Sequence, residues 1–328
     1  MLKTLLAASS GAGARARLSV LIFHRVLPEP DPLFPGEIDA VAFRAICGWL
    51  AAWCQVLPLT EAMRRLAEGT LPPRACAITF DDGYADNHSV ALPILQAHGL
   101  SATFFVATGF LNGGRMWNDT VIESLRRTER PTIDLHELPG DGAADSPIAT
   151  VTSSERRSAI DQLLQRLKYL PIDARVVATE RLAALAQVVP PADLMMTTAQ
   201  LRGLHAAGMT IGAHTVSHPI LARLDRAAAQ SEIKDGKAAL EAMIDAPVTL
   251  FAYPNGKPGT DYSAETIALA RAVGFDAAFS TAWGTAQRGG DRFQVPRFTP
   301  WDRTRVRFGM RMVANLRRRG TVPALLSG

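Results

Sequence analysis

The stretch Ile78-Thr79-Phe80-Asp81-Asp82-Gly83 governs how the rest of this chain is interpreted. It closes an apolar run that begins at Ala75, and short apolar runs that end on turn residues are typical of buried strands. The pattern predicts a strand that presents Asp81 and Asp82 at its C-terminal end, with Gly83 permitting a tight turn. Adjacent strand residues point to opposite sides, so the two carboxylates can have different partners. The alternative for an isolated D-D-G is an ordinary aspartate-rich turn.

A second stretch, His214-Thr215-Val216-Ser217-His218, also follows a short apolar run, residues 210–213. Two histidines four residues apart can share one face of a helical turn and coordinate one cation through their imidazole nitrogens. Taken together, the two stretches supply two histidines and one aspartate for a metal and leave a second aspartate over. A carboxylate beside a metal is suited to act as a general base in hydrolysis.

These stretches resemble the first and second motifs of the polysaccharide deacetylase (NodB-homology) family of metal-dependent carbohydrate esterases. The stretch Phe251-Ala252-Tyr253-Pro254-Asn255-Gly256 resembles the third motif. The three occur in the family's order, each after a predicted strand, and the resemblance covers roughly residues 18–301. Each motif alone is unspecific, whereas the ordered set is specific.

The resemblance implies a role for each motif residue. Asp82, His214 and His218 would bind a divalent metal, with Zn²⁺ expected and Co²⁺ or Ni²⁺ as alternatives. Asp81 would be the general base, and a metal-bound water would be the nucleophile. A cation held by three protein groups polarises a carbonyl and lowers the pKa of a bound water toward about 7.

The third motif departs from the family's usual pattern, in which many relatives carry an arginine and a tyrosine. This chain has Ala252 and Asn255 at those positions. The tyrosine's role there is attributed largely to its backbone N–H, which helps to hold the oxyanion, and Asn255 can supply an N–H equally well. In relatives this arginine orients the base. Arg297, at the end of a late strand predicted over residues 294–298, is its candidate replacement, and the alternative is a surface arginine. Tyr253 and Pro254 are predicted to contact substrate.

A second departure concerns the general acid. Relatives of the usual layout carry a late histidine that protonates the leaving amine, but no histidine follows His218 here. His24 ends an early predicted strand in the same style. We therefore interpret the chain as a circularly permuted member in which His24 is the general acid, a role suited to histidine because its ordinary pKa lies near neutrality. A structural histidine is the alternative.

Alternating strand and helix patterns predict an α/β fold, and the resemblance implies a distorted (β/α) barrel of about seven strands. The rhythm is lost between about residues 109 and 192, which indicates a long helical insertion, either a wall of the substrate groove or a passive cap. We expect a single polysaccharide-deacetylase-like domain over residues 1–328, with the site at the C-terminal ends of the strands. Trp117 and Trp301 could stack against sugar rings, or simply pack.

Composition and charge limit the classes of partner that we expect for this chain. The chain has 328 residues, 48% of them hydrophobic, and a net charge of +4 with a sequence pI of about 9.2. No stretch interleaves basic and aromatic residues as a nucleic-acid binder would. We expect a cytoplasmic protein without signal peptide or transmembrane helix. Residues 303–328 form a basic C-terminal helix and tail, with seven arginines and no acidic residue over residues 303–319. This segment could contact the anionic inner membrane or an acidic glycan, or be a solvated helix face.

The expected activity is metal-dependent hydrolysis of N-acetyl groups, which are carbon–nitrogen amide bonds, in an amino-sugar-containing polysaccharide or envelope glycan precursor. Two alternatives remain. One is a non-catalytic glycan-binding relative that keeps the metal. The other is a non-haem iron oxygenase, since two histidines and a carboxylate also form that class's metal triad. An oxygenase has no use for a second carboxylate beside the ligand.

Overall fold

The computed structural model describes residues 1–136, 138, 147–300 and 302–318, and contacts divide the chain into two compact units. The first unit comprises Met1–Glu29, Ile38–Leu111 and Met196–Gly328, and the second comprises Pro30–Glu37 and Asn112–Met195. The predicted insertion, about 109–192, nearly coincides with the longer segment of the second unit. The short segment Pro30–Glu37 also belongs to that unit, which the sequence analysis did not predict. That residues 1–328 form a single polysaccharide-deacetylase-like domain stays a prediction.

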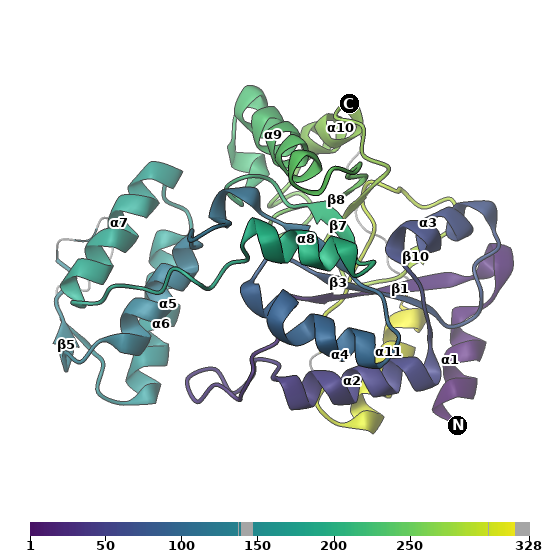
Figure 1. The fold of residues 1–328 in the computed structure, drawn as a ribbon, viewed down its shortest axis with the longest axis horizontal. Coiled ribbons are helices and arrows are strands. Elements are labelled where there is room, and N and C mark those ends of the chain that lie inside the picture. Colours follow the sequence, from purple (N-terminus) through teal and green to yellow (C-terminus); the bar gives the residue numbers. More distant parts are fainter. Residues whose placement is uncertain (137, 139–146, 301, 319–328) are drawn as a thin grey trace. The chain divides into compact units, whose positions relative to one another are not determined.

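The first unit is built on a sheet that curls into a half-barrel, which confirms the predicted α/β barrel class (Figure 1). The strand order is β10-β1-β3-β4-β7-β8-β9, with β2 paired to β3. Every pair is parallel except β1 with β10. The strands are β1 (Arg17–Phe23), β2 (Gln55–Val56), β3 (Ala75–Phe80), β4 (Thr103–Val106), β7 (Thr210–Ala213), β8 (Leu250–Ala252), β9 (Ala277–Phe279) and β10 (Ala286–Gln287).

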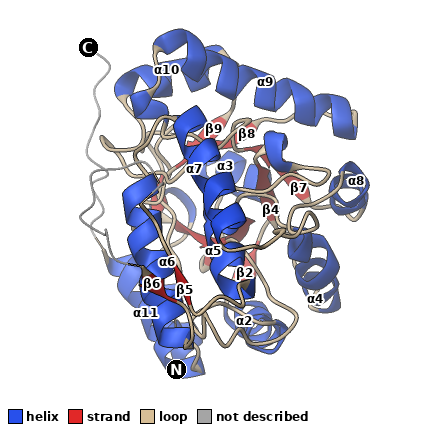
Figure 2. Cartoon of the chain, turned by 90° about the vertical axis from the view of Figure 1, so that its left-hand side faces the viewer, coloured by secondary structure: helices blue, strands red, loops and turns tan. Residues whose placement is uncertain are grey.

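Helices cover the outer face of this sheet; Figure 2 shows α4, α8, α9 and α10 around β4, β7, β8 and β9. Alternation along the strands separates two apolar clusters. On β4, Phe104 packs in the outer cluster beneath the helices, and the next residue, Phe105, packs in the inner cluster with Phe279 of β9. The helices of this unit are α1 (Leu2–Ser10), α2 (Ala40–Trp53), α3 (Leu59–Glu68), α4 (Leu92–Ala97), α8 (Thr198–Ala206), α9 (Arg226–Ile244), α10 (Ala264–Ala272) and α11 (Arg305–Arg317).

Residues 295–298, which we call the closing segment, join the two ends of the curled sheet. Val295 bridges Phe279 of β9 in parallel, and Phe298 bridges Leu21 of β1 in parallel. The sequence predicted a regular strand over 294–298. The segment instead makes one bridge on each side, because it crosses from β9 to β1 within four residues. The last element of the barrel is thus a connection that carries Arg297 across its interior.

The second unit contains three helices and a short antiparallel hairpin in its described part. Its elements are α5 (Trp117–Arg127), β5 (Thr132–Ile133), β6 (Ile148–Ala149), α6 (Ser153–Leu167) and α7 (Ile172–Leu185). The helices bury a separate apolar cluster that includes Leu125, Leu163 and Leu182. Arg126 of α5 pairs with both carboxylate oxygens of Asp31, at 2.9 and 2.6 Å, which ties the segment Pro30–Glu37 to this unit.

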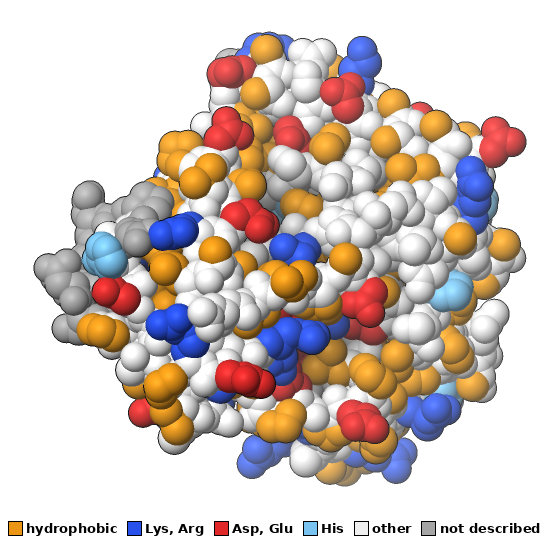
Figure 3. Space-filling model, turned by 60° about the vertical axis from the view of Figure 1, so that its left-hand side comes forward, with side chains coloured by type: hydrophobic (Ala, Val, Ile, Leu, Met, Phe, Trp, Pro, Cys, Tyr) orange, Lys and Arg blue, Asp and Glu red, His pale blue; other side chains and the backbone are white. Residues whose placement is uncertain are grey.

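The surface carries charges of both signs. On the face drawn in Figure 3, lysine and arginine side chains are interspersed with aspartate and glutamate and with scattered apolar side chains. Such a mixture is usual for a protein surface and gives no directional field on this face. Within the described ranges, none of the helices has both the length and the apolar character that crossing a bilayer requires.

Candidate active site

Asp81 lies at the C-terminal end of β3 and faces a buried arginine. Its N–H donates to the carbonyl of Phe23 at 3.0 Å, which extends the pairing of β3 with β1 by one residue. Both carboxylate oxygens accept from Arg297, whose Nη1 and Nη2 each lie 2.7 Å away. The Ser280 carbonyl and the Thr79 hydroxyl accept further hydrogen bonds from the same guanidinium. The predicted neighbourhood of Arg297 and Asp81 is therefore observed as a bidentate pair.

This pair is removed from solvent, yet Asp81 keeps its charge. Arg297 has no exposed surface and Asp81 is 2% exposed. Burial alone raises the pKa of a carboxyl group, because low-dielectric surroundings disfavour the charged form. The charge of Arg297, followed by that of His214, outweighs burial, so the pKa of Asp81 lies below its ordinary value. Each carboxylate oxygen has two lone pairs, and the pairing with Arg297 leaves capacity to accept a proton.

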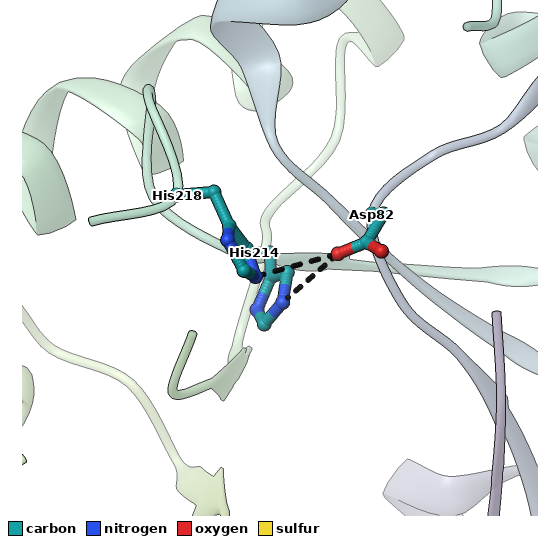
Figure 4. Close-up of side chains that lie close together, drawn as sticks. All are labelled: Asp82, His214 and His218. Carbon is teal, nitrogen blue, oxygen red and sulfur yellow. Dashed lines mark ion pairs between the residues drawn. The ribbon is translucent and has the colours of Figure 1, made fainter. Parts of the chain in front are cut away.

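The neighbouring Asp82 has different partners, as the alternation along a strand predicts. Its Oδ1 lies 3.5 Å from Nε2 of His214 and 3.4 Å from Nε2 of His218 (Figure 4). One ligand atom from each of these three residues lies within 4.8 Å of the others. Asp82 has a backbone φ of 77°, and Gly83 follows with φ 95°, so the chain turns sharply where the two carboxylates diverge.

The three side chains fit a divalent cation. Oδ1 of Asp82 is buried and has no hydrogen-bond partner among the described residues, an arrangement that calls for a positive partner. Ligand atoms about 2.0–2.1 Å from a tetrahedral zinc lie roughly 3.3–3.4 Å apart, close to the two separations from Asp82. Burial lowers the pKa of His218 to about 4, which leaves its imidazole in the neutral form that binds metals near pH 7.

The stretch from His214 to His218 is a loop, so the predicted helical turn is wrong. Thr215 and His218 have φ of 65° and 53°, in the left-handed region that a helix excludes. The histidines still converge, because the loop doubles back and their ring centres lie 4.8 Å apart. Nδ1 of His214 lies 2.7 Å from the carbonyl of Ala252 on β8, a contact that directs Nε2 toward Asp82.

Glu232 of α9 holds this loop from behind, and the sequence analysis missed it. Its Oε2 accepts from the N–H groups of Val216 and Ser217 at 2.9 and 2.8 Å, and its Oε1 accepts from the Ser217 hydroxyl at 2.5 Å. One turn further along α9, Gly236 lets the loop approach closely, since a Cβ there would lie 2.8 Å from the carbonyl carbon of Thr215. A glutamate fourteen residues beyond the motif carries no local signal in the sequence.

His24 is exposed and follows β1 directly. The register of β1 with β3 pairs Phe23 with Phe80, which brings His24 next to Asp81 at the same edge of the sheet. The side chain of Asn87 donates to the His24 carbonyl at 2.8 Å. The backbone of His24 thus lies beside that of Asp81, and its role as general acid stays a prediction.

The third motif contributes backbone groups to the site. Asn255 is half-buried with φ 58°, and its N–H makes no hydrogen bond to the described residues. Pro254 is buried beside it. Tyr253 requires a correction: it has no exposed surface, stacks on Tyr262 with ring centres 4.0 Å apart, and donates to the Phe293 carbonyl. Its side chain belongs to the core, so we withdraw its predicted contact with substrate.

Two tryptophans, Trp117 and Trp301, were predicted to stack on sugars. Trp117 belongs to the second unit, where it is half-buried and the guanidinium of Arg175 lies 4.9 Å from its ring centre. Trp301 lies outside the described residues. Both contacts with substrate stay predictions.

The strand ends of this curled parallel barrel bring together a carboxylate pair and two histidines. This architecture is that of a barrel hydrolase with a candidate metal-binding site. The family model described as "Polysaccharide deacetylase" matches residues 68–131 and 154–278, more than half of the chain. The chain belongs to the polysaccharide deacetylase family, and it is accordingly a deacetylase, a hydrolase of amide bonds.

Individual relatives agree with this assignment. YxkH of Bacillus subtilis (strain 168) is 23% identical over 275 residues, which cover 83% of this chain and 67% of YxkH. IcaB from Ammonifex degensii has a similar structure, with a TM-score of 0.59 and 20% identity over 94% of this chain and 99% of its own. The Streptococcus pyogenes deacetylase PplD, whose structure was solved in complex with acetate, has a TM-score of 0.57 and 18% identity over 87% of this chain and 92% of its own. At these identities, the two structures support the fold.

Proposed function

We propose that the protein is a metal-dependent deacetylase that removes N-acetyl groups from an amino-sugar-containing glycan, releasing acetate and a free amine. One observation carries this proposal: adjacent carboxylates have separate partners. Asp82 faces two histidines, whereas Asp81 is held by Arg297. Hydrolysis by a metal-activated water needs such a division between ligand and base.

Asp82, His214 and His218 would hold the cation, for which we propose Zn²⁺. A bound divalent cation supplies Lewis-acid polarisation of the acetyl carbonyl and lowers the pKa of a coordinated water toward about 7. The protein's own contribution is to fix the donors. The Ala252 carbonyl orients His214, and Glu232 holds the loop that carries both histidines.

Asp81 would accept the proton of the attacking water. Its depressed pKa keeps it ionised near neutral pH, and the bidentate contact with Arg297 fixes its orientation. The water oxygen bonds to the acetyl carbon, and the carbon–nitrogen bond then breaks. The N–H of Asn255 would donate to the oxyanion that forms between these steps, which agrees with its lack of another acceptor.

His24 would supply the proton that the departing amine nitrogen needs. Its position beside Asp81 follows from the pairing of β1 with β3. This assignment is also the basis for proposing a circular permutation, in which the strand that carries the acid comes first in the chain and still lies next to the strand that carries the base. The exposed position of His24 agrees with a role in contacting a bulky substrate.

The first test is acetate release from N-acetylglucosamine tetramer by zinc-loaded protein, with Asp81→Asn as the catalytic blank. We expect release by the wild type, loss after chelation, recovery with zinc, and a decrease of about 10²–10⁴-fold in the variant. Exposed Glu265, which pairs with Arg226 on the surface, provides the matched control, and Glu265→Gln should keep full activity. Binding of the tetramer without release would favour the non-catalytic alternative, and iron-dependent oxygen consumption would favour an oxygenase.

A second variant separates the acid from the metal site. His24→Ala should lower turnover by about 10²–10⁴-fold while the zinc content remains at one per chain. Turnover that is essentially unchanged with zinc still bound would refute the role of His24. The location in the cytoplasm and a contact of the basic C-terminal segment with the anionic inner membrane stay predictions, to be checked by cell fractionation.

A further inference from the structure

A cavity of about 470 Å³ opens beside α11, away from the side chains that would bind the metal. Trp283, which follows β9, forms one part of its lining. Asp302, the α11 residues Arg307 and Arg311, and Arg318, which directly follows α11, form another. This volume lies within the range of about 300–1,000 Å³ that is usual for small-ligand sites. The cavity lies wholly within the first unit.

The charges around this cavity are unbalanced. Arg311 is paired in a bidentate manner with Asp302. Within the described ranges, Arg307 and Arg318 have no acidic partner in an ion pair. Three arginines and one aspartate leave an excess of two positive charges, and guanidinium groups match the planar geometry of a carboxylate. The cavity therefore favours an anionic ligand.

An aromatic ring accompanies these charges. The guanidinium carbons of Arg311 and Arg318 lie 5.8 and 5.4 Å from the centre of the Trp283 ring. The ring is fixed in place, because it packs edge-on against Phe298 and because Asn315 of α11 donates to the carbonyl of Gly284 at 2.8 Å. An apolar surface rimmed by cations suits a ligand with a C–H-rich face and a carboxylate, as a uronic acid has.

The cavity is connected to the proposed reaction centre through a short piece of chain. Ser280, whose carbonyl accepts from Nε of Arg297, precedes Trp283 by three residues. Three residues of chain span at most about 11 Å. Since Arg297 also holds Asp81, the segment that carries Trp283 starts beside the proposed base, and a glycan of several units could extend from one position to the other. A polymeric substrate can reach both positions, whereas a single sugar cannot.

We propose that this cavity is a subsite for an acidic sugar residue, so that the glycan substrate carries carboxylated as well as N-acetylated units. The identity of the ligand as a glycan rests on the proposed function. An anionic membrane is the competing partner for the arginines of α11. We favour the glycan because three arginines converge on one cavity with a tryptophan. Val306 and Met310 of α11 are also exposed, so binding to vesicles is measured as the competing outcome.

The test measures binding by calorimetry with two N-acetylated probes, hyaluronan tetrasaccharide, which contains glucuronate, and neutral chitotetraose. The test variant is Arg311→Gln/Arg318→Gln. The matched control is Arg305→Gln/Arg317→Gln, which removes the same charge from the segment 305–318 at two residues that do not line the cavity. Sedimentation with phosphatidylglycerol vesicles is measured for the same proteins, and acetate release from chitotetraose is followed in parallel.

We expect wild type and control to bind the acidic tetrasaccharide at least about tenfold more tightly than chitotetraose, and the test variant to lose this preference. Equal binding of both probes by the wild type, or equal loss in the control, would overturn the subsite. The subsite would also be overturned if the test variant loses binding to vesicles but still prefers the acidic tetrasaccharide. If acetate release is lost in Asp81→Asn but the wild type shows no preference for the acidic tetrasaccharide, the subsite alone is overturned. If the wild type shows that preference but releases no acetate, the proposed reaction alone is overturned.

Discussion

The two halves of the candidate site are held in different ways. Asp81 is fixed by a fully buried ion pair with Arg297, inside the barrel. The histidine loop is fixed from outside by half-buried Glu232, through hydrogen bonds to backbone and hydroxyl groups. A buried charge without its partner is strongly disfavoured, whereas a loop that loses a hydrogen-bond acceptor can be resolvated. The proposed base therefore depends on the integrity of the barrel, and the proposed metal ligands depend on one contact with a helix.

The largest effect should follow from Arg297→Met, which leaves Asp81 buried without a counter-charge. We expect the free energy of unfolding to fall by about 3–5 kcal/mol, measured by urea denaturation. The double variant Asp81→Leu/Arg297→Met should recover most of this loss, because neither charge is then buried alone. Arg271→Met, at an exposed pair with Asp291, is the control and should change stability by less than about 1 kcal/mol. Equal losses at both sites would remove the distinction between the two halves.

A smaller effect is expected at Glu232, and on a different quantity. Glu232→Ala removes the acceptor of three hydrogen bonds to the loop, so zinc affinity should fall about 10–100-fold, as competition with a chelator would report. Glu232→Gln keeps one acceptor oxygen and should lie between the alanine variant and the wild type. The free energy of unfolding of the metal-free protein should change less than in Arg297→Met. Unaltered zinc affinity in both variants would show that the loop is organised without this helix.

The smallest effect is expected at an ion pair that has the same bidentate geometry but is more exposed to solvent. Arg126 also makes two hydrogen bonds to one carboxylate, that of Asp31, but the Arg126 side chain is 29% exposed. Arg126→Met should cost no more than about 1 kcal/mol. Burial raises the pKa of Asp31, but the contact with Arg126 outweighs it and the pKa lies below 3.8.

The sign of the pH dependence follows from that shift. The folded protein binds the Asp31 proton less readily than the unfolded chain does, so this pair stabilises fully above pH 3.8 and stops doing so as the pH falls through the lowered pKa. The stability difference between wild type and Arg126→Met should therefore shrink in acid. A difference that grows below pH 4 would contradict this assignment.

The position of a candidate site residue could be predicted from the sequence wherever that residue directly follows a strand. Asp81, Asp82 and His24 end apolar runs, and parallel strands place such residues at one edge, so their proximity could be predicted. Arg297 could be proposed for the same reason. Glu232 and the left-handed residues of the histidine loop could not, since their geometry depends on a helix that packs on the loop rather than on local periodicity. Tyr253 was misassigned because adjacency to a motif says nothing about which side a residue faces.

The closing segment has a consequence for synthesis on the ribosome. Phe298 pairs with Leu21, so the strand that leaves the ribosome among the first waits for a partner made almost three hundred residues later. Until that partner arrives, Asp81 lacks Arg297, and the edge of β1 lacks its neighbour. Long-range pairings of this kind are slow to form and leave unpaired strand edges open to aggregation. A nascent chain that ends before residue 298 therefore lacks both the partner of Leu21 and the guanidinium that holds the proposed base, so the proposed site can be completed only after Arg297 and Phe298 have been made.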